Sequence, residues 1–213
     1  MEINVIGCDY TDTVLYLIRV LECMGKRPLI RDMTREHRLY AAVPHLEELD
    51  PVRDIIDYAG TGYTYSMNIS DDYDTYIRLY DSDMLPFVKG ATIVITGENR
   101  QSIDRLCALN WQKYCGDGRN ICFVIKNYTG CISKRLDELV RLADIKKVFP
   151  IPVNKRDFRI GILAEYKGKY KFSGLSNAYR DALFGILSTI FPELDSRETE
   201  VFVNKAAKGG RKR

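Results

Sequence analysis

The chain has 213 residues, of which 46% are hydrophobic and 29% charged, so it is long enough for one sizeable core and rather short for two. Its 32 basic and 29 acidic residues leave a net charge of +3, which excludes a strong overall attraction to nucleic acid. No run approaches the ~18 apolar residues of a membrane span, and nothing at the amino terminus resembles a signal peptide. The six cysteines form no CxxC pair, which indicates reduced, buried thiols of a cytoplasmic protein.

The beginning of the chain has the pattern of a strand, a helix and a second strand. INVIG (3–7) is a short apolar run ended by glycine, which is typical of a buried strand. From 12 to 24 the apolar residues recur at three- and four-residue spacing, and Gly25 follows as a helix stop. RPLIRD (27–32) is predicted as the next strand. Three such elements in about thirty residues form a βαβ unit, whose right-handed crossover implies a parallel sheet.

Strands and helices alternate over most of the remaining chain. Residues 33–72 mix turn signals with short apolar stretches, and within them 52–60 is predicted as an edge strand or short helix. Later strands are expected at 74–81, 91–97, 120–128 and 147–152, and helices at 100–115, 132–145 and 176–190. The alternation predicts an α/β fold, a doubly wound, mostly parallel sheet of about six or seven strands flanked by helices. We expect one domain over 1–192 and a flexible basic tail over 193–213.

In their order and spacing, these segments resemble the deviant P-loop ATPases of the MinD and ParA type. ATIVITGENRQSIDRLCAL (91–109) is similar to the family segment ADxVIVVTxPExxSIxxAxxL, and GKRPLIRDMT (25–34) is similar to GKKVLLIDxD. VIKNYTG (124–130) and FPIPVNKRDFRIGILAEYKGKY (149–170) are similar to the segments that lie near the adenine base. The resemblance implies a P-loop NTPase-like fold with the phosphate loop between the first strand and the first helix.

The resemblance also implies a vestigial nucleotide site, whose members lie in the first loop or at the ends of strands: Gly7, Thr11, Thr13, Asp32, Asp81 and Asn127. The glycine and one threonine hydroxyl would meet the phosphates and Mg²⁺. The two strand-end aspartates would place Mg²⁺ and the attacking water, or would simply satisfy loop amides as in any α/β protein. The asparagine would meet the base or tie its strand end to the next loop.

The first loop lacks the charge that binds phosphate. No basic side chain lies between Met1 and Arg19, so the P-loop lysine is missing. Asp9 and Asp12 add negative charge, and two like charges about 5 Å apart repel by roughly 0.8 to 3 kcal/mol at effective dielectric constants of 80 to 20. The favoured interpretation is that one of them caps the following helix, and the alternative is a divalent cation shared with the strand-end aspartates. Tight triphosphate binding is therefore not expected.

The function that these features favour is a non-catalytic or weakly nucleotide-binding scaffold or localisation protein, which acts through protein partners and as a homodimer. A resemblance to the TadZ and CpaE proteins of tight-adherence pili suggests pilus or secretion assembly. We expect no cofactor or weakly bound ATP with Mg²⁺, no metal site, and a cytoplasmic location that reaches the membrane through a partner. The basic tail adds a weak contact with anionic surfaces. The alternatives are an active ATPase with an atypical loop and a doubly wound domain unrelated to ATPases, such as a flavodoxin-like one.

Overall fold

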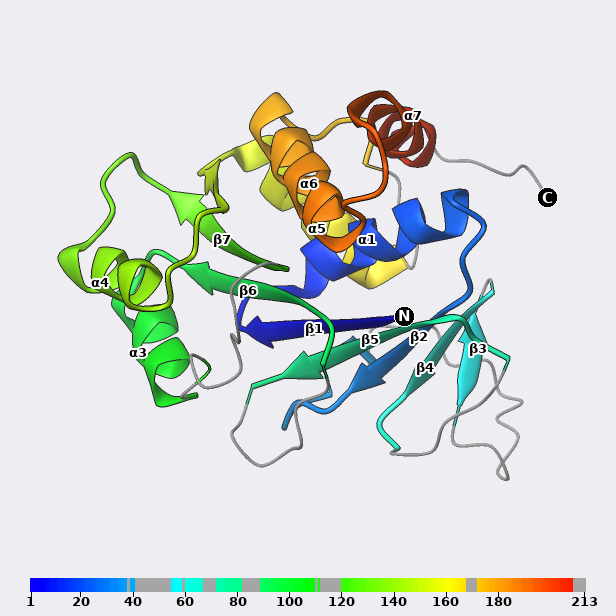
Figure 1. Ribbon diagram of the computed structural model, residues 1–213, viewed down its shortest axis with the longest axis horizontal. Helices are drawn as coiled ribbons and strands as arrows, with labels where there is room; N and C mark the ends of the chain where they lie inside the picture. Colours follow the sequence, from blue (N-terminus) through cyan, green and yellow to red (C-terminus); the bar gives the residue numbers. More distant parts are fainter. Residues whose placement is uncertain are drawn as a thin grey trace.

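The computed structural model describes residues 1–37, 39–40, 55–58, 60–66, 72–81, 89–109, 111, 120–167 and 172–208. Its strands are β1 (Glu2–Gly7), β2 (Pro28–Asp32), β3 (Ile56–Tyr58), β4 (Thr61–Thr64), β5 (Thr75–Tyr80), β6 (Ala91–Gly97), β7 (Ile121–Tyr128) and β8 (Val148–Pro152). Its helices are α1 (Thr11–Cys23), α3 (Arg100–Ala108), α4 (Lys134–Leu142), α5 (Lys155–Lys167), α6 (Asn177–Ile190) and α7 (Ser196–Ala207). Strands and helices alternate along most of this order (Figure 1).

The sheet has the order β3-β4-β2-β5-β1-β6-β7-β8, and β3 is the strand that runs antiparallel to its neighbour. The predicted α/β class and mostly parallel sheet are confirmed, although the described part of the chain forms a sheet of eight strands rather than six or seven. Strand β4 accounts for the difference, because its few apolar residues give little periodic signal. Strand β3 lies at the sheet edge within 52–60, where an edge strand or short helix was predicted. The carboxyl ends of the parallel strands meet at one edge, where β1 lies between β5 and β6.

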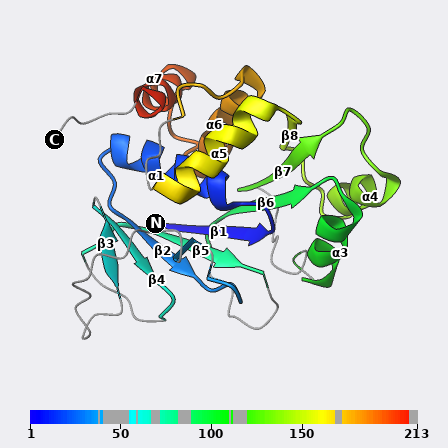
Figure 2. The same ribbon diagram turned by 180° about the vertical axis from the view of Figure 1, so that it is seen from behind.

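Helices cover both faces of the sheet. Helices α1, α5, α6 and α7 pack on one face, and α3 and α4 on the other (Figures 1 and 2). Strand β1 serves both sides, because Val5 joins the α1 cluster while Ile6 joins the α3 cluster. Each large aliphatic side chain buried in these clusters contributes about 1.5 to 3 kcal/mol relative to exposure. Among the described helices, none is both long and apolar enough to cross a membrane.

Strand β7 contains a bulge that sets which side chains point toward α1. Cys122 and Val124 belong to the α1 cluster, and Lys126 follows at the same two-residue spacing. The register against β8 shifts between Lys126 and Tyr128, so Asn127, with φ of +57°, is the extra residue. Beyond it, Tyr128 packs on the α3 and α4 side. The bulge therefore leaves Lys126 as the last side chain of β7 on the α1 face.

The segment 193–213, expected as a flexible tail, instead contains helix α7. A capping box starts this helix: Asp195 accepts from the Glu198 backbone N at 2.7 Å, and the Glu198 carboxylate accepts from the Asp195 N at 3.3 Å. The helix packs against α1 and α6. The prediction of a flexible tail did not take this capping box into account, although it marks where the helix begins. Residues 209–213 of the predicted tail lie outside the described residues.

The cysteines that the structure describes are free thiols, but they are less buried than expected. Only Cys122 among them is buried, Cys131 is exposed, and Cys8, Cys23 and Cys107 are intermediate. Burial raises the pKa of the Cys122 thiol to about 12. The prediction of buried thiols is thus correct for Cys122 and wrong for the other described cysteines. Cys23 and Cys107 lie on helices beside the buried stripe, whereas Cys8 and Cys131 lie in loops.

We expect Val203→Ala in α7 to lower the free energy of unfolding by about 1 to 2 kcal/mol, because it removes two buried methyl groups. Val203 is 4% exposed. Val201→Ala is the matched control on the same helix: Val201 is 55% exposed, so the change should stay within about 0.5 kcal/mol. Urea unfolding followed by circular dichroism measures both. Equal values for the two variants would mean that α7 does not pack on α1 in solution.

Candidate functional site

The loop between β1 and α1 begins with a glycine that backbone packing requires. Gly7 has φ of +121°, and a Cβ at this position would lie 2.0 Å from the carbonyl oxygen of Ile95 in β6. The next backbone N–H, of Cys8, donates to the same oxygen at 3.0 Å. Glycine is needed because β1 and β6 approach this closely, whether or not a phosphate ever binds. Its presence is therefore no evidence for nucleotide binding.

Neither loop aspartate is the N-cap residue of α1, which is Tyr10 and makes no side-chain cap hydrogen bond. Asp12 lies in the first turn, and its carboxylate accepts from the backbone N of Thr13 at 2.7 Å. Asp9, with φ of +58°, accepts instead from the Ser102 hydroxyl of α3 at 3.2 Å. Thr11 is the first residue of α1 and is half-buried. The prediction that one of them serves the helix start is therefore correct in part: Asp12 accepts from a first-turn N–H, whereas Asp9 contacts α3 and neither is the N-cap residue.

Asp12 forms an ion pair with a lysine from β7. The Lys126 ammonium nitrogen lies 2.5 Å from both carboxylate oxygens of Asp12, and the two side chains are only 10% and 14% exposed. Lys126 also donates to the Tyr179 hydroxyl of α6 at 3.3 Å and lies 5.2 Å from the centre of that ring. The Tyr179 hydroxyl lies 2.7 Å from the Thr13 hydroxyl, so the threonine is part of the same network.

Burial keeps the phenol of this network protonated. Burial first, and then the charge of Asp12, raise the pKa of Tyr179 well above its ordinary value. At neutral pH the hydroxyl therefore carries its proton and can both accept from Lys126 and donate to Thr13. A carboxylate, an ammonium and two hydroxyls thus satisfy one another at the amino end of α1.

Helix α5 covers the Asp12 carboxylate. A Cβ on Gly161 would lie 3.1 Å from Asp12 Oδ2 and 3.3 Å from Asp12 Cβ, so the absence of a side chain permits this approach. Asp157 holds the same helix to the start of α6, because its carboxylate accepts from the Ser176 N at 2.7 Å and from the Ser176 hydroxyl at 2.5 Å. Figure 2 shows α5 lying across the outer side of α1. The ion pair is therefore enclosed between β7, α1, α5 and α6.

The carboxylate of Asp32 accepts hydrogen bonds from the loop that follows it. It is fully buried, and Oδ1 accepts from the N and hydroxyl of Thr34 at 3.3 and 2.5 Å. Oδ2 accepts from the N atoms of Leu39 and Tyr40 at 2.8 and 3.1 Å. Four donors leave this carboxylate little capacity to hold water or a cation.

Asp81 and Asn127 lie at the same edge of the sheet without meeting each other's side chains. Both oxygens of Asp81 accept from the backbone N of Arg35, each at 3.2 Å. Asn127 is exposed at the bulge of β7. The alternative in which strand-end aspartates satisfy loop amides thus describes the contacts of both Asp32 and Asp81.

The described residues contain no group of three or more His, Cys, Asp or Glu side chains placed to hold a metal ion. The hypothesis of a cation shared by the loop and strand-end aspartates is therefore not supported. The same contacts do not fit a polyphosphate with Mg²⁺, because Lys126 is neutralised by Asp12 and the Thr13 hydroxyl faces Tyr179. The ammonium group that lies beside the first turn of α1 is thus already paired with a carboxylate.

The residues of the first loop alone did not indicate that Lys126, Tyr179 and Gly161 would contact it. The lysine had a signal, since Cys122, Val124 and Lys126 alternate along a predicted strand and so share a face. Tyr179 lies on the buried side of α6, within the range 176–190 that was predicted as a helix. Gly161 carried no such signal, because its role depends on how closely α5 approaches α1.

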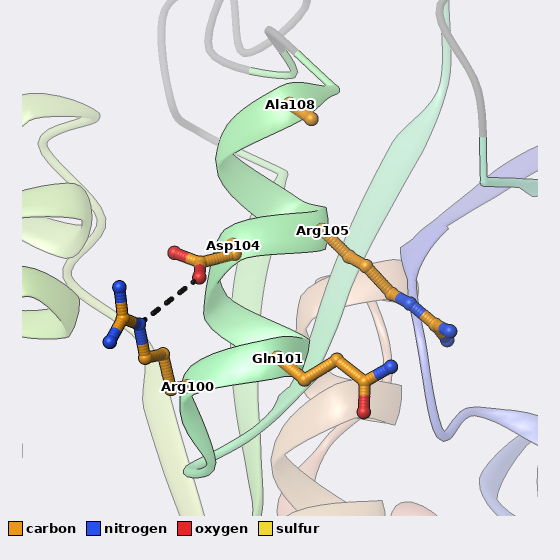
Figure 3. Close-up of a pocket in the computed structure, with 5 residues that line it drawn as sticks. All are labelled: Arg100, Gln101, Asp104, Arg105 and Ala108. Carbon is orange, nitrogen blue, oxygen red and sulfur yellow. Dashed lines mark ion pairs between the residues drawn. The ribbon is translucent and has the colours of Figure 1, made fainter.

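A separate depression of about 550 Å³ lies along α3 and is lined by Arg100, Gln101, Asp104, Arg105 and Ala108. Asp104 pairs with Arg100 at 3.5 Å and with Arg135 of α4 at 2.5 Å. Figure 3 shows Gln101 and Arg105 pointing away from the Arg100–Asp104 pair. Because these polar groups do not converge, we do not take this surface as the functional site.

Gly7→Ala should lower the free energy of unfolding by about 3 kcal/mol or more, because the new methyl group collides with the Ile95 carbonyl. Gly25→Ala is the control: Gly25 also has a positive φ, of +81°, but no atom lies within 4 Å of its Cβ position. That change should cost about 1 kcal/mol. Denaturant unfolding compares the two, and similar costs would contradict the close approach of β1 and β6.

A double-mutant cycle measures the ion pair. Lys126→Met should lower the free energy of unfolding by about 2 to 3 kcal/mol, since it leaves the largely buried Asp12 charge unpaired. Adding Asp12→Asn should recover part of this loss, giving a coupling energy of about 1 kcal/mol or more. The exposed pair Arg100 and Asp104 serves as control, with an expected coupling below about 0.5 kcal/mol. Equal coupling in both pairs would contradict the enclosed network.

No protein-family model matches the sequence, and no curated protein gives a significant match. Among solved structures, a protein of Borrelia burgdorferi B31 described as a plasmid partition protein bound to AMPPNP aligns with TM-score 0.51 at 12% identity, over 91% of this chain and 99% of its own. A ParA family ATPase from Chlorobium tepidum TLS gives TM-score 0.48 at 12% identity, covering 96% of each chain. The MinD cell division protein of Aquifex aeolicus gives 0.46 at 14%, covering 97% of this chain and 95% of that one. The likeness to the partition protein shows that the chain shares the fold of that protein.

Proposed function

We propose that the protein is a scaffold or localisation protein that keeps the ParA and MinD fold, does not hydrolyse nucleotide, and acts through contacts with other proteins. The observation that supports this most directly is the ion pair between Asp12 and Lys126 at the amino end of α1. A phosphate group bound at a helix start needs free backbone N–H groups and a cation. Here the nearest ammonium is already paired with a carboxylate of the same chain.

An entering polyphosphate would face two costs. It would have to separate Asp12 from Lys126 or meet the Asp12 charge directly, and both act in a region of low exposure where charges are weakly screened. It would also have to move α5, because Gly161 lies against the Asp12 carboxylate. Both costs favour a protein that functions without a tightly bound nucleotide.

The second candidate is an ATPase in which Lys126 replaces the missing loop lysine. It is favoured by the place of the ammonium, which lies beside the first turn of α1 although it comes from β7. If Asp12 turned away, the lysine and the helix dipole would both face an anion. The Borrelia burgdorferi protein that shares the fold was solved with AMPPNP bound, which makes ATP the nucleotide to test.

The wider setting of the proposal rests on the sequence resemblance. It comprises a protein partner, a homodimer, a cytoplasmic location with access to the membrane through a partner, and a role in pilus or secretion assembly. The resemblance to TadZ and CpaE stays a prediction. So does the organisation as a single domain, although the packing of α7 on α1 and α6 extends this domain beyond residue 192.

Calorimetric titration with Mg–ATP and Mg–ADP tests the proposal. The unaltered chain should give no saturable heat up to about 1 mM nucleotide, which corresponds to a binding free energy weaker than about −4 kcal/mol. Micromolar affinity that disappears in Lys126→Met would establish the second candidate instead. Measurement of phosphate release under the same conditions distinguishes binding from hydrolysis.

The variant Asp12→Asn tests whether Asp12 blocks a site that could otherwise bind nucleotide, or whether the capacity to bind nucleotide is absent altogether. We expect this variant to bind Mg–ATP with a dissociation constant of about 0.1 to 1 mM, because it frees Lys126 while the first loop itself still has no lysine. Asp137→Asn on α4 is the control, since it removes an exposed first-turn carboxylate far along the chain and should leave binding unchanged. Equal binding by both variants would show that Asp12 does not close the site.

A further inference from the structure

The segment from β8 into α5 exposes large apolar side chains close together. Val153 is 61% exposed, Phe158 67%, Ile162 38% and Leu163 39%. Phe158 and Ile162 are four residues apart, so they lie one turn from each other on the same side of α5. Single exposed apolar residues are common, but a group on one short segment indicates an interaction surface.

Positive charges are interspersed with these side chains. Lys155, Arg156 and Arg159 are exposed. The only acidic residue from 153 to 164 is Asp157, which is buried and bound to Ser176. Among the side chains from 153 to 164, where the structure describes them, the exposed ones are therefore all apolar or basic. We call it the α5 face, defined by Val153, Lys155, Phe158, Arg159, Ile162 and Leu163.

The buried side of α5 fixes the α5 face outward. Gly161 lies against Asp12, and Ala164 is 1% exposed within the α1 cluster. Asp157 secures the first turn of the helix to α6. Figure 2 shows α5 on the outside of the helical layer, in front of α1. The α5 face is thus part of a helix already held in place, so binding through it costs little ordering of the chain.

We propose that the α5 face docks on an anionic phospholipid bilayer. Basic side chains between protruding aromatic and aliphatic ones match a layer of anionic headgroups above an apolar layer. A partner helix would need a groove, whereas these side chains project from the outside of a helix. Nucleic acid would satisfy Lys155 and Arg159 but would give Phe158 and Ile162 no apolar environment. The docking does not involve Asp12 or Lys126 and does not depend on the proposed function.

Flotation of the full-length chain with large unilamellar vesicles tests the proposal. With phosphatidylcholine vesicles containing roughly 30% phosphatidylserine, the bound fraction should be about tenfold higher than with phosphatidylcholine alone. Raising the salt to about 1 M should remove most of this difference, because the Debye length falls to about 3 Å. Equal flotation with both vesicles, or none with either, would overturn the proposal.

Two variants locate the contact on the α5 face. Phe158→Ser with Ile162→Ser, and separately Lys155→Gln with Arg159→Gln, should each reduce partition into anionic vesicles about tenfold. Unchanged unfolding midpoints confirm that these variants fold. A loss confined to the α5 variants supports the proposal.

The controls are matched in exposure and chemistry. Leu142→Ser on α4 removes an apolar side chain that is 76% exposed, and Lys134→Gln with Arg141→Gln removes two exposed charges from the same helix. Changing Lys208, Arg211, Lys212 and Arg213 to Gln tests the basic carboxyl terminus. All three should bind as the unaltered chain does. If the terminal variant abolished flotation while the α5 variants bound normally, the proposal would be wrong.

Discussion

The contact between Asp12 and Lys126 is the interaction on which the arrangement of this edge of the sheet depends. It joins the first turn of α1 to the end of β7, which lies 114 residues away in the chain. Tyr179 brings α6 to the same point, and Gly161 lets α5 close over it. Because both charged side chains are largely buried, neither can lose its partner without a substantial cost in stability. The space at the amino end of α1 is thereby filled by the protein's own charged groups.

The fold was predictable from sequence wherever burial follows a regular period. The strand at Ala91–Gly97 is buried throughout, and the helix at Thr11–Cys23 carries a clear apolar stripe, so both were found. Helix α5 was missed because Phe158 and Ile162 point outward and blur its stripe. Helix α7 was not predicted, although Asp195 and Glu198 form a capping box that can be recognised in the sequence. The spacing of apolar residues alone does not predict a helix or strand where exposed apolar residues or short elements interrupt the pattern.

The position of the candidate site in the fold could be predicted from the sequence, but the contacts of its side chains could not. Parallel strands do bring Gly7, Asp32 and Asp81 to one edge, as their positions after strands imply. What each side chain does there depends on partners that local sequence does not reveal. The two loop aspartates suggested repulsion when considered alone, yet Asp12 is neutralised by Lys126 from another strand. The glycine suggested a phosphate loop, whereas its closest neighbour is the β6 backbone.

The enclosure of the ion pair also constrains how the sequence can vary. A change at position 12 leaves Lys126 unpaired, a change at position 126 leaves Asp12 unpaired, and any side chain at position 161 presses on the carboxylate. A single substitution at one of these positions therefore gives a less stable protein. We expect tolerated changes to replace several of these positions together. Among homologous chains, an acidic residue at 12 should covary with lysine at 126 and glycine at 161. A lysine in the first loop should appear only where all three have been replaced.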